Sequence, residues 1–380
     1  MGCGSSRKHI NPDEVDISHF EIQRVIGKGG FGKVNAVIKI SAPQKGKWFA
    51  MKALKKHYIV EHNSYSEVFW EMEILRDMSH DFICNIHYAF QDERYLFLVM
   101  DVALGGDLRF HLNHAQQRCF DESRTKFYIA SLIIALEYVH SLNILHRDIK
   151  PENVLMDTEG YLKLTDFGIS ARLEGPDKPC TRKSGTHGYM APEIYSRRHE
   201  HGVASEAFSL GVVCHEFLCG LRPYDPNSFK NQVACSKTRF DAQEGTFGDG
   251  VKVLLQRKKD LTPRVVDFTV NLLRLNKHDR LGREGMQSLR EHDWFNGFDW
   301  EEMRSRKTPA PFKPDISRAN CDTGELDLMD GLGSGDEQLS ARSIEEAAQD
   351  KFEGYAHNTM LVAEQKHARG SNNAKVAAGK

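Results

Sequence analysis

Residues 146–153 read His-Arg-Asp-Ile-Lys-Pro-Glu-Asn, and residues 166–168 read Asp-Phe-Gly. One such motif alone would fit a polar loop between short strands. Two motifs in this order and at this spacing favour a site that transfers a phosphoryl group from ATP. Such chemistry needs a proton acceptor, a cation beside the moving phosphoryl group and oxygen ligands for Mg²⁺. The residues that meet these needs are Asp148 as acceptor, Lys150 as cation, and Asn153 and Asp166 as ligands.

A glycine-rich stretch, Gly-Lys-Gly-Gly-Phe-Gly-Lys-Val, occupies residues 27–34. Glycines let the backbone approach phosphates closely. Alone the motif could mark a Rossmann turn, but the β-branched flanks at 20–25 and 34–40 favour a strand hairpin over the nucleotide. The residues expected at the nucleotide are Gly27, Lys28, Gly29, Gly30, Phe31, Gly32 and Val34.

A lysine ends the apolar strand pattern Phe49-Ala50-Met51-Lys52. Such a lysine is usually a solvated surface residue. Glu71, however, lies downstream on the helical pattern of residues 63–78. An ion pair between Lys52 and Glu71 would aim the ammonium group at the α- and β-phosphates.

Taken together, these motifs resemble those of a eukaryotic protein kinase, and the resemblance covers residues 20–295. It resembles the serine/threonine class, because Lys-Pro-Glu-Asn occupies residues 150–153 and Gly-Thr at 185–186 precedes Ala-Pro-Glu at 191–193. That last triplet is typical of kinases with protein substrates, which disfavours a small-molecule kinase sharing the fold. The resemblance implies ATP and Mg²⁺ as cofactors and serine or threonine hydroxyls of proteins as substrates.

Within this family the chain is similar to the AGC group and most like the YANK family, serine/threonine kinase 32. Residues 16–34, 90–112 and 296–328 carry the closer likeness. The third stretch lies outside the catalytic core and contains Phe-Asp-Trp at 298–300.

The resemblance implies an α+β, two-lobed protein-kinase fold. The small lobe, residues 20–102, would be a mostly antiparallel sheet with one regulatory helix, and the large lobe, residues 103–295, would be mainly helical. The flanking segments would be an acylated N-terminal segment at 1–19, an AGC-type extension at 296–330 and a mostly disordered tail, rich in small and charged residues, at 331–380.

Hydrophobic patterning places the individual elements. Residues 20–54 predict three strands, 63–79 a helix and 86–101 two more strands. In the large lobe, residues 121–141 predict a buried helix that begins at an aspartate cap, and residues 203–219 predict a second buried helix.

The family's adenine pocket would lie at the hinge that joins the lobes. Its apolar residues could equally be ordinary core, and only the spacing of the motifs favours the binding role. The residues expected there are Val34, Ala50, Met100, Asp101, Ala103 and Leu155.

Two further sets of residues follow from the resemblance. Arg280 matches the arginine that pairs with the glutamate of Ala-Pro-Glu, here Glu193. Asp107, Glu152 and Glu216 match carboxylates that attract arginine upstream of the acceptor in basophilic kinases, although a structural role is equally open.

Glu206 departs from the family pattern, which usually has aspartate there to bind the backbone of the His-Arg-Asp turn. The added methylene could shift the catalytic loop and slow the reaction.

The activation loop departs from the pattern as well. Arg182 occupies the slot of the phosphorylated threonine, and Ala171 and Glu67 replace residues that are commonly basic. Arg182 could pair with Glu67 and order the loop, although Arg147 would oppose this pairing. Two solvated surface charges are the alternative. A competing hypothesis places phosphate on Thr181 or Ser184.

The tail contains one aromatic fragment, Phe-Glu-Gly-Tyr-Ala-His, at residues 352–357. It resembles the AGC hydrophobic motif, which docks on the small lobe, although short aromatic pairs also arise by accident. Ala356 occupies a position where a phosphorylatable residue is common, so phosphorylation there could not regulate the docking.

Composition sets the remaining limits. The chain has 380 residues and a net charge of −2, which predicts no nucleic-acid partner. Its 8 cysteines lack paired spacing, so reduced cytosolic thiols are expected. No apolar run is long enough to span a bilayer, and a monomer is the default expectation.

The first residues nevertheless predict membrane attachment. Met-Gly-Cys-Gly-Ser-Ser at 1–6 fits the myristoylation pattern with Gly2 as acceptor, although a small flexible terminus has the same composition. One acyl chain binds weakly, so a second signal is needed: palmitate on Cys3, or Arg7 and Lys8 on anionic lipid. The sequence thus predicts a cytoplasmic protein held peripherally on a membrane, the plasma membrane being one option.

Two function hypotheses from different classes follow. The first is an active, membrane-anchored serine/threonine kinase, and the second is a pseudokinase scaffold that binds nucleotide or partners without efficient catalysis. The retained catalytic residues favour the first, whereas Glu206 and the altered activation loop leave the second open.

Overall fold

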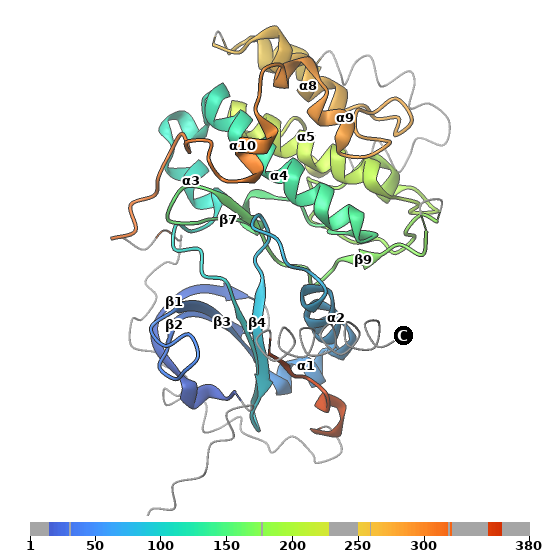
Figure 1. Ribbon diagram of the computed structural model, residues 1–380. Coiled ribbons are helices and arrows are strands. Elements are labelled where there is room, and N and C mark those ends of the chain that lie inside the picture. The colour runs from blue at the N-terminus through green and yellow to red at the C-terminus, as the bar shows by residue number, and fades with distance from the viewer. Residues whose placement is uncertain are drawn as a thin grey trace, which may run out of the picture. The chain divides into compact units, whose positions relative to one another are not determined.

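The computed structural model describes residues 15–29, 32–175, 178–227, 250–258, 260–317, 320 and 349–358 (Figure 1). The chain divides into two compact units. The first unit comprises the described parts of Met1–Arg76, Asn85–Val102 and Thr323–Lys380, and the second comprises those of Asp77–Cys84 and Ala103–Asp322. A β-rich and an α-rich unit confirm the expected α+β class.

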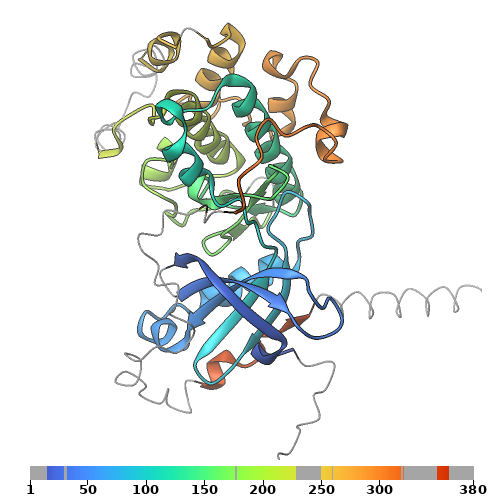
Figure 2. The ribbon, with the colours of Figure 1, turned by 90° about the vertical axis from the view of Figure 1, so that its left-hand side faces the viewer.

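The first unit contains one antiparallel, strongly twisted sheet (Figure 2). Its spatial order is β1-β2-β3-β5-β4-β10. The five longer strands confirm the sequence prediction, whereas β10 was not expected. The bounds are β1 (Phe20–Gly29), β2 (Gly32–Lys39), β3 (Trp48–Lys55), β4 (Ile86–Gln91), β5 (Tyr95–Met100) and β10 (His357–Asn358).

Aromatic side chains fill the core on one face of this sheet. Phe20 stacks on Phe90 with ring centroids 5.9 Å apart and meets the edges of Phe49 and Tyr88. Burying such large apolar surfaces is the main favourable term for a sheet of this size.

Among its described residues, the first unit also contains two α-helices, α1 (Lys56–Glu61) and α2 (Tyr65–Arg76). The helix predicted at 63–79 is α2, whereas α1 was missed because it is one short turn after a strand. Val68, Glu71, Met72 and Leu75 are buried on α2 at helical spacing, so its inner face includes the predicted glutamate.

The second unit is mainly helical, and its two longest described helices, α4 and α5, are buried around most of their circumference. Asp121 caps α4 as predicted, accepting a hydrogen bond from the backbone N–H of Arg124 at 2.7 Å. The α-helices whose bounds are defined within the described residues are α3 (Leu108–His114), α4 (Glu122–Ser141), α5 (Val203–Cys219), α8 (Pro263–Leu272), α9 (Gln287–Arg290) and α10 (Trp300–Arg304).

Short strands and 3₁₀ turns connect these helices. The strands are β6 (Ile144–Leu145), β7 (Val154–Met156), β8 (Leu162–Leu164) and β9 (Ala171–Arg172). Within the described residues, the 3₁₀ turns are η1 (Ile17–His19), η2 (Gln116–Arg118), η3 (Pro151–Asn153), η4 (Pro192–Tyr195), η5 (Asp293–Phe295) and η7 (Asp350–Phe352). Across the described ranges, no helix combines the length and apolarity that a bilayer crossing requires.

Residues 77–84 belong to the second unit, although the sequence places them in the small lobe of residues 20–102. The backbone N–H of Cys84 donates to the carbonyl of Leu164 at 2.9 Å, and the N–H of Leu164 donates to the carbonyl of Phe82 at 2.9 Å. This short bridge to β8 holds the segment, and hydrophobic patterning does not reveal such pairings.

The described part of the C-terminal extension, residues 296–317, also packs on the second unit. The Arg124 guanidinium lies 3.9 Å from the Phe312 ring centroid, and the Tyr161 hydroxyl donates to the carbonyl of Thr308. Residues 321–348, where the family's extension would continue, lie outside the described residues.

Candidate active site

The catalytic loop of the second unit is held by the His146 ring. The ring Nδ1 accepts the backbone N–H of Asp148 at 3.2 Å, and Nε2 donates to the carbonyl of Thr165 at 2.9 Å. The same ring packs against buried Phe167 at 4.8 Å between centroids. The motifs at residues 146–153 and 166–168 therefore pack on each other through His146 and Phe167.

Asp148 is the most heavily hydrogen-bonded carboxylate of this loop and is only 7% exposed. Its Oδ1 accepts from the backbone N–H of Thr186 at 2.9 Å and from its hydroxyl at 2.5 Å. Its Oδ2 accepts from Lys150 Nζ at 2.6 Å and Asn153 Nδ2 at 3.0 Å.

These donors keep Asp148 ionised. Burial raises the pKa of the carboxyl, but the hydrogen bonds from Lys150 and Thr186 lower it by more, so the pKa lies below its ordinary value. An ionised carboxylate at neutral pH can accept a proton from a hydroxyl.

Gly185 allows Thr186 to reach Asp148. Its φ is +125°, and a Cβ there would lie 2.8 Å from Cγ of Met190 and 2.9 Å from the carbonyl oxygen of Arg147. A side chain at this position would push the activation segment off the catalytic loop. Thr186 Oγ1 also accepts from Lys150 Nζ at 2.7 Å, which closes a three-residue polar network.

Asn153 and Asp166 are the predicted metal ligands. The Asn153 amide donates to the Asp148 carbonyl at 2.9 Å as well as to its carboxylate, which fixes the side chain. Asp166 follows β8, has a φ of +66° and is exposed. An amide oxygen and a carboxylate suit Mg²⁺, which keeps waters and substrate phosphate oxygens as its other ligands.

In the first unit, β3 and α2 bring Lys52 and Glu71 together as predicted. Lys52 Nζ lies 2.7 Å from Oε1 and 2.8 Å from Oε2 of Glu71. Glu71 is buried and Lys52 is about a quarter exposed, so the ammonium group is oriented by a fixed anion while one side stays accessible.

The glycine-rich stretch forms a hairpin and not a strand-to-helix turn. Gly29 pairs with Gly32 at the end of the antiparallel β1–β2 ladder, which excludes the Rossmann alternative. A Cβ on Gly32 would lie 1.7 Å from the carbonyl oxygen of Ala53, so the sheet itself requires glycine there. Gly30 and Phe31 lie outside the described residues, as does the side chain of Lys28.

The residues predicted at the adenine are distributed over both units. In the first unit, Ala50 pairs with Met100 across β3 and β5, and Val34 pairs with Lys52 across β2 and β3. The Asp101 carboxylate accepts from Asn85 and His87, which ties the end of β5 to β4. Ala103 and Leu155 belong to the second unit. Their convergence on one nucleotide remains a prediction.

Residues 20–295 match the family model described as the protein kinase domain. The chain belongs to the protein kinase family. The chain is 36% identical over 309 residues to "Ribosomal protein S6 kinase 2 beta" of Xenopus laevis, covering 80% of this chain and 46% of that protein. It is 35% identical over 336 residues to "Serine/threonine-protein kinase 32C" of Mus musculus, covering 87% and 65%.

A third relative is "Protein kinase 2" of Dictyostelium discoideum, 34% identical over 317 residues, with 83% of this chain and 62% of the relative covered. The chain therefore spans between about half and two thirds of the length of these relatives. The AGC likeness and the likeness to serine/threonine kinase 32 are confirmed.

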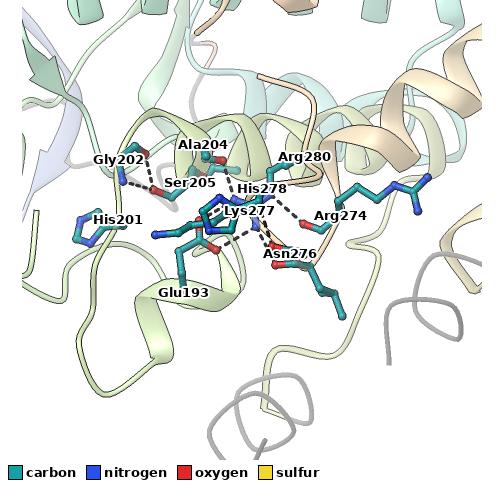
Figure 3. A network of polar contacts seen from close by, with 12 residues as sticks. Glu193, His201, Gly202, Ala204, Ser205, Arg274, Asn276, Lys277, His278 and Arg280 are labelled. Atoms are coloured by element: carbon teal, nitrogen blue, oxygen red, sulfur yellow. Dashed lines mark hydrogen bonds and ion pairs between the residues drawn. The ribbon is translucent and has the colours of Figure 1, made fainter. Parts of the chain in front are cut away.

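The kinase chain contains the predicted buried ion pair between Arg280 and Glu193 (Figure 3). The guanidinium is fully buried and contacts the two carboxylate oxygens at 2.6 and 3.0 Å. It also donates to the carbonyls of Arg274, Ala204 and Leu275. Because each side of the guanidinium is satisfied, the pair fixes η4 against α5 and the loop before α9.

Glu206 retains the contact that the family's aspartate makes. Its Oε1 accepts the backbone N–H of Arg147 at 2.6 Å, and its Oε2 lies 2.5 Å from Nε2 of His140. The sequence predicted that the longer side chain could displace the catalytic loop. The kinase instead has a second partner, His140 on α4, for the second oxygen.

The carboxylates predicted to attract substrate arginine have other partners. Arg109 Nε donates to Glu152 at 2.8 Å, and its two terminal nitrogens contact Glu216 at 3.0 and 3.2 Å. The Tyr189 hydroxyl donates to Glu216 at 2.6 Å. Asp107 caps α3 by accepting the N–H of Phe110 at 2.8 Å. Sequence reasoning missed Arg109, because no spacing rule links it to either glutamate.

The activation segment is held to the catalytic loop by Arg147. Its guanidinium donates to the carbonyls of Ile169 at 2.6 Å and Arg182 at 3.2 Å, and to Sγ of Cys180 at 3.3 Å. Arg182 occupies the expected slot with an exposed side chain. Its pairing with Glu67 remains a hypothesis, since Glu67 belongs to the other unit.

Thr181 is exposed and Ser184 is half-buried. Their phosphorylation, the competing hypothesis for the activation loop, also remains a prediction.

The aromatic fragment of the tail docks on the first unit, as predicted. Phe352 and Tyr355 are buried, and their rings lie 5.2 Å from Tyr65 and 5.4 Å from Phe69 on α2. Gln91 of β4 donates to the carbonyl of Phe352 at 2.8 Å. Because α2 carries Glu71, the tail braces the helix that orients Lys52.

Proposed function

We propose that the chain is an active protein serine/threonine kinase that transfers the γ-phosphate of ATP to hydroxyl groups of proteins. The observation that carries this proposal is the assembled network around Asp148, in which Lys150, Asn153 and Thr186 each donate to the carboxylate. A scaffold that had lost catalysis would have no need to keep a proton acceptor ionised and oriented in this way.

Each residue has a distinct task in this reaction. Asp148 accepts the proton of the substrate hydroxyl, and Lys150 neutralises charge on the transferred group. Lys52, oriented by Glu71, binds the α- and β-phosphates. Asn153 and Asp166 would hold Mg²⁺, which offsets charge on the phosphates when bound.

The test is a Mg²⁺-dependent phosphorylation assay of the full chain, with autophosphorylation and a generic protein substrate as readouts. Asp166→Ala should abolish phosphate transfer. Thermal stabilisation by ATP and Mg²⁺ is measured in parallel. A wild-type chain that binds nucleotide but transfers no more phosphate than Asp166→Ala would be a pseudokinase, which refutes the proposal.

We also propose that substrate selection involves competition with Arg109. Basic residues upstream of the acceptor would meet Glu152 and Glu216 only by displacing the internal guanidinium, which holds both. The preference for basic substrates should therefore be weaker than it would be if the two carboxylates had no internal partner.

From the sequence of residues 1–8 alone, we propose myristoylation of Gly2, with Cys3 acylation or the Arg7–Lys8 pair as the second membrane signal. These residues lie outside the described part of the chain. Fractionation of cells that express the wild type or Gly2→Ala tests the proposal. Loss of the membrane fraction in the variant supports it, and an unchanged distribution refutes it.

A further inference from the structure

Cys180, in the activation segment, pairs with His201 through two backbone hydrogen bonds. The N–H of Cys180 donates to the His201 carbonyl at 2.8 Å, and the N–H of His201 donates back at 2.9 Å. This bridge places the activation segment against His201, which precedes Gly202, the N-cap of α5. Figure 3 shows His201 and Gly202. Three chemically different groups meet here: a thiol, an imidazole and the Arg147 guanidinium.

The His201 ring is almost fully buried, with 2% exposure. Its Nδ1 lies 2.5 Å from the carbonyl oxygen of His199. The Nε2 atom is buried as well, and the ring lies close enough to Cys180 for its side chain to interact with the thiol.

Hydrogen-bonding and charged neighbours make the Cys180 thiol acidic. Burial raises its pKa, but the His201 imidazole, the backbone N–H of Arg182 and the Arg147 guanidinium lower it by more, so the pKa is about 7. Roughly half of the thiol is therefore thiolate at neutral pH. Cys180 is also only half-buried, so small molecules can reach it.

The other cysteines of the second unit provide a contrast. Burial raises the pKa of Cys214 to about 12 and that of Cys219 to about 11. All the cysteines within the described ranges are free thiols. Reactivity depends on the thiolate and on access. Cys180 differs from both of these thiols in its pKa, and it differs from Cys214 in access as well, because Cys214 is fully buried.

We propose that Cys180 is a reversible modification site that exchanges with low-molecular-weight disulfides and thereby controls the activation segment. The thiolate attacks one sulfur of the disulfide RSSR. The new bond joins Cys180 Sγ to SR, the S–S bond of the reagent breaks, and the second sulfur leaves as thiolate and takes a proton from water. A thiol such as glutathione reverses the step.

The modification acts through Arg147. A mixed disulfide removes the negative charge that the guanidinium contacts at 3.3 Å and places a bulky group beside it. The same guanidinium holds Ile169 and Arg182, and the backbone N–H of Arg147 binds Glu206 beneath the catalytic loop. Displacing it loosens the anchor of the activation segment one residue from Asp148.

Thiol reactivity is tested first, without any activity assay. The full reduced chain is alkylated over a range of pH, and each cysteine is followed by peptide mass spectrometry. The Cys180 rate should reach half its maximum near pH 7 in the folded chain and near about pH 8.5 in urea. His201→Gln should raise the folded midpoint, and Cys214 should stay unmodified as an internal control. Equal midpoints in the folded and denatured chain would overturn the proposal.

Control of activity is tested next, and this arm rests on the proposed kinase function. Oxidised glutathione should modify Cys180 and lower phosphate transfer several-fold, and dithiothreitol should restore it. Cys180→Ser should abolish this sensitivity, whereas Cys119→Ser should retain it.

Full modification of Cys180 with an unchanged rate of phosphate transfer would refute the regulation of activity by this thiol. A chain inactive under all redox conditions would refute the kinase activity together with the control, while the alkylation data still decide the reactivity of Cys180.

Discussion

Replacing Glu206 by Asp, the residue that the family usually has at this position, should impair this kinase. Glu206 is 3% exposed and uses both oxygens: Oε1 for the N–H of Arg147 at 2.6 Å and Oε2 for His140 at 2.5 Å. Removing one methylene withdraws the carboxylate by about 1.5 Å. The shorter side chain then loses one partner, or the catalytic loop moves to follow it.

Both outcomes have estimable magnitudes. A buried donor left without its acceptor costs about 1–3 kcal/mol of folding free energy. A loop shift of about 1 Å next to Asp148 costs about 100-fold in kcat. Glu206→Gln replaces one accepting oxygen by an NH₂ group, leaves one buried donor without its acceptor, and should likewise cost about 1–3 kcal/mol of stability.

The pH dependence of stability has a defined sign. Burial raises the pKa of Glu206, but the His140 side chain and the Arg147 N–H lower it by more, so the folded-state pKa lies below the ordinary value. The carboxylate therefore contributes stability above its unfolded pKa of about 4.3, and this contribution is lost as pH falls through the folded pKa. The stability gap between wild type and Glu206→Gln should narrow on acidification.

The assay combines urea unfolding with kcat and KM measurements on wild type, Glu206→Asp and Glu206→Gln. Glu174→Asp makes the same chemical change at an exposed glutamate and should alter neither quantity. If Glu206→Asp matched the wild type in both kcat and unfolding midpoint, the assigned role of the His140–Glu206–Arg147 network would be wrong.

Two further substitutions test other parts of the kinase. Phe352→Ala removes a ring with 0% exposure and should cost up to about 3–5 kcal/mol of docking free energy. The tail fragment should then become accessible to protease, and kcat should fall. Equal protease protection in Phe352→Ala and in the control Glu353→Ala would contradict the docking. Arg109→Met removes the guanidinium from Glu152 and Glu216 and leaves Glu216 with the Tyr189 hydroxyl. A peptide-array profile should then shift toward substrates with upstream arginine, by up to about tenfold per charge pair. An unchanged profile would show that the two glutamates do not contact the substrate.

The residues that the sequence located well are those whose partners follow from motif spacing. Lys52 of β3 and Glu71 in the middle of α2 form the ion pair that their motifs and spacing predicted. Capping at Asp121 follows from local chemistry alone. Alternating apolar residues likewise predicted the five longer strands of the first unit.

The features that the sequence did not reveal depend on pairings between distant segments. Arg109 meets Glu216 across 107 positions of the chain, and no pattern in either neighbourhood signals the contact. The bridge between Cys180 and His201 and the strand β10 on β4 have the same origin. In each case a short, polar or isolated segment gains its structure from a partner that only the folded chain provides.

These hidden pairings have a common physical consequence. At three positions where the AGC resemblance predicts an external or variable partner, an internal group is already bound. Arg109 contacts Glu216, and the Cys180 sulfur contacts Arg147. The tail docks through buried Phe352 and Tyr355, although Ala356 replaces a phosphorylatable residue. An internal partner is held at high effective concentration, so an external one must displace it. We therefore expect control of this kinase to require the breaking of internal contacts. Of the three, the contact of the Cys180 sulfur is the one that our proposed disulfide exchange would break and restore.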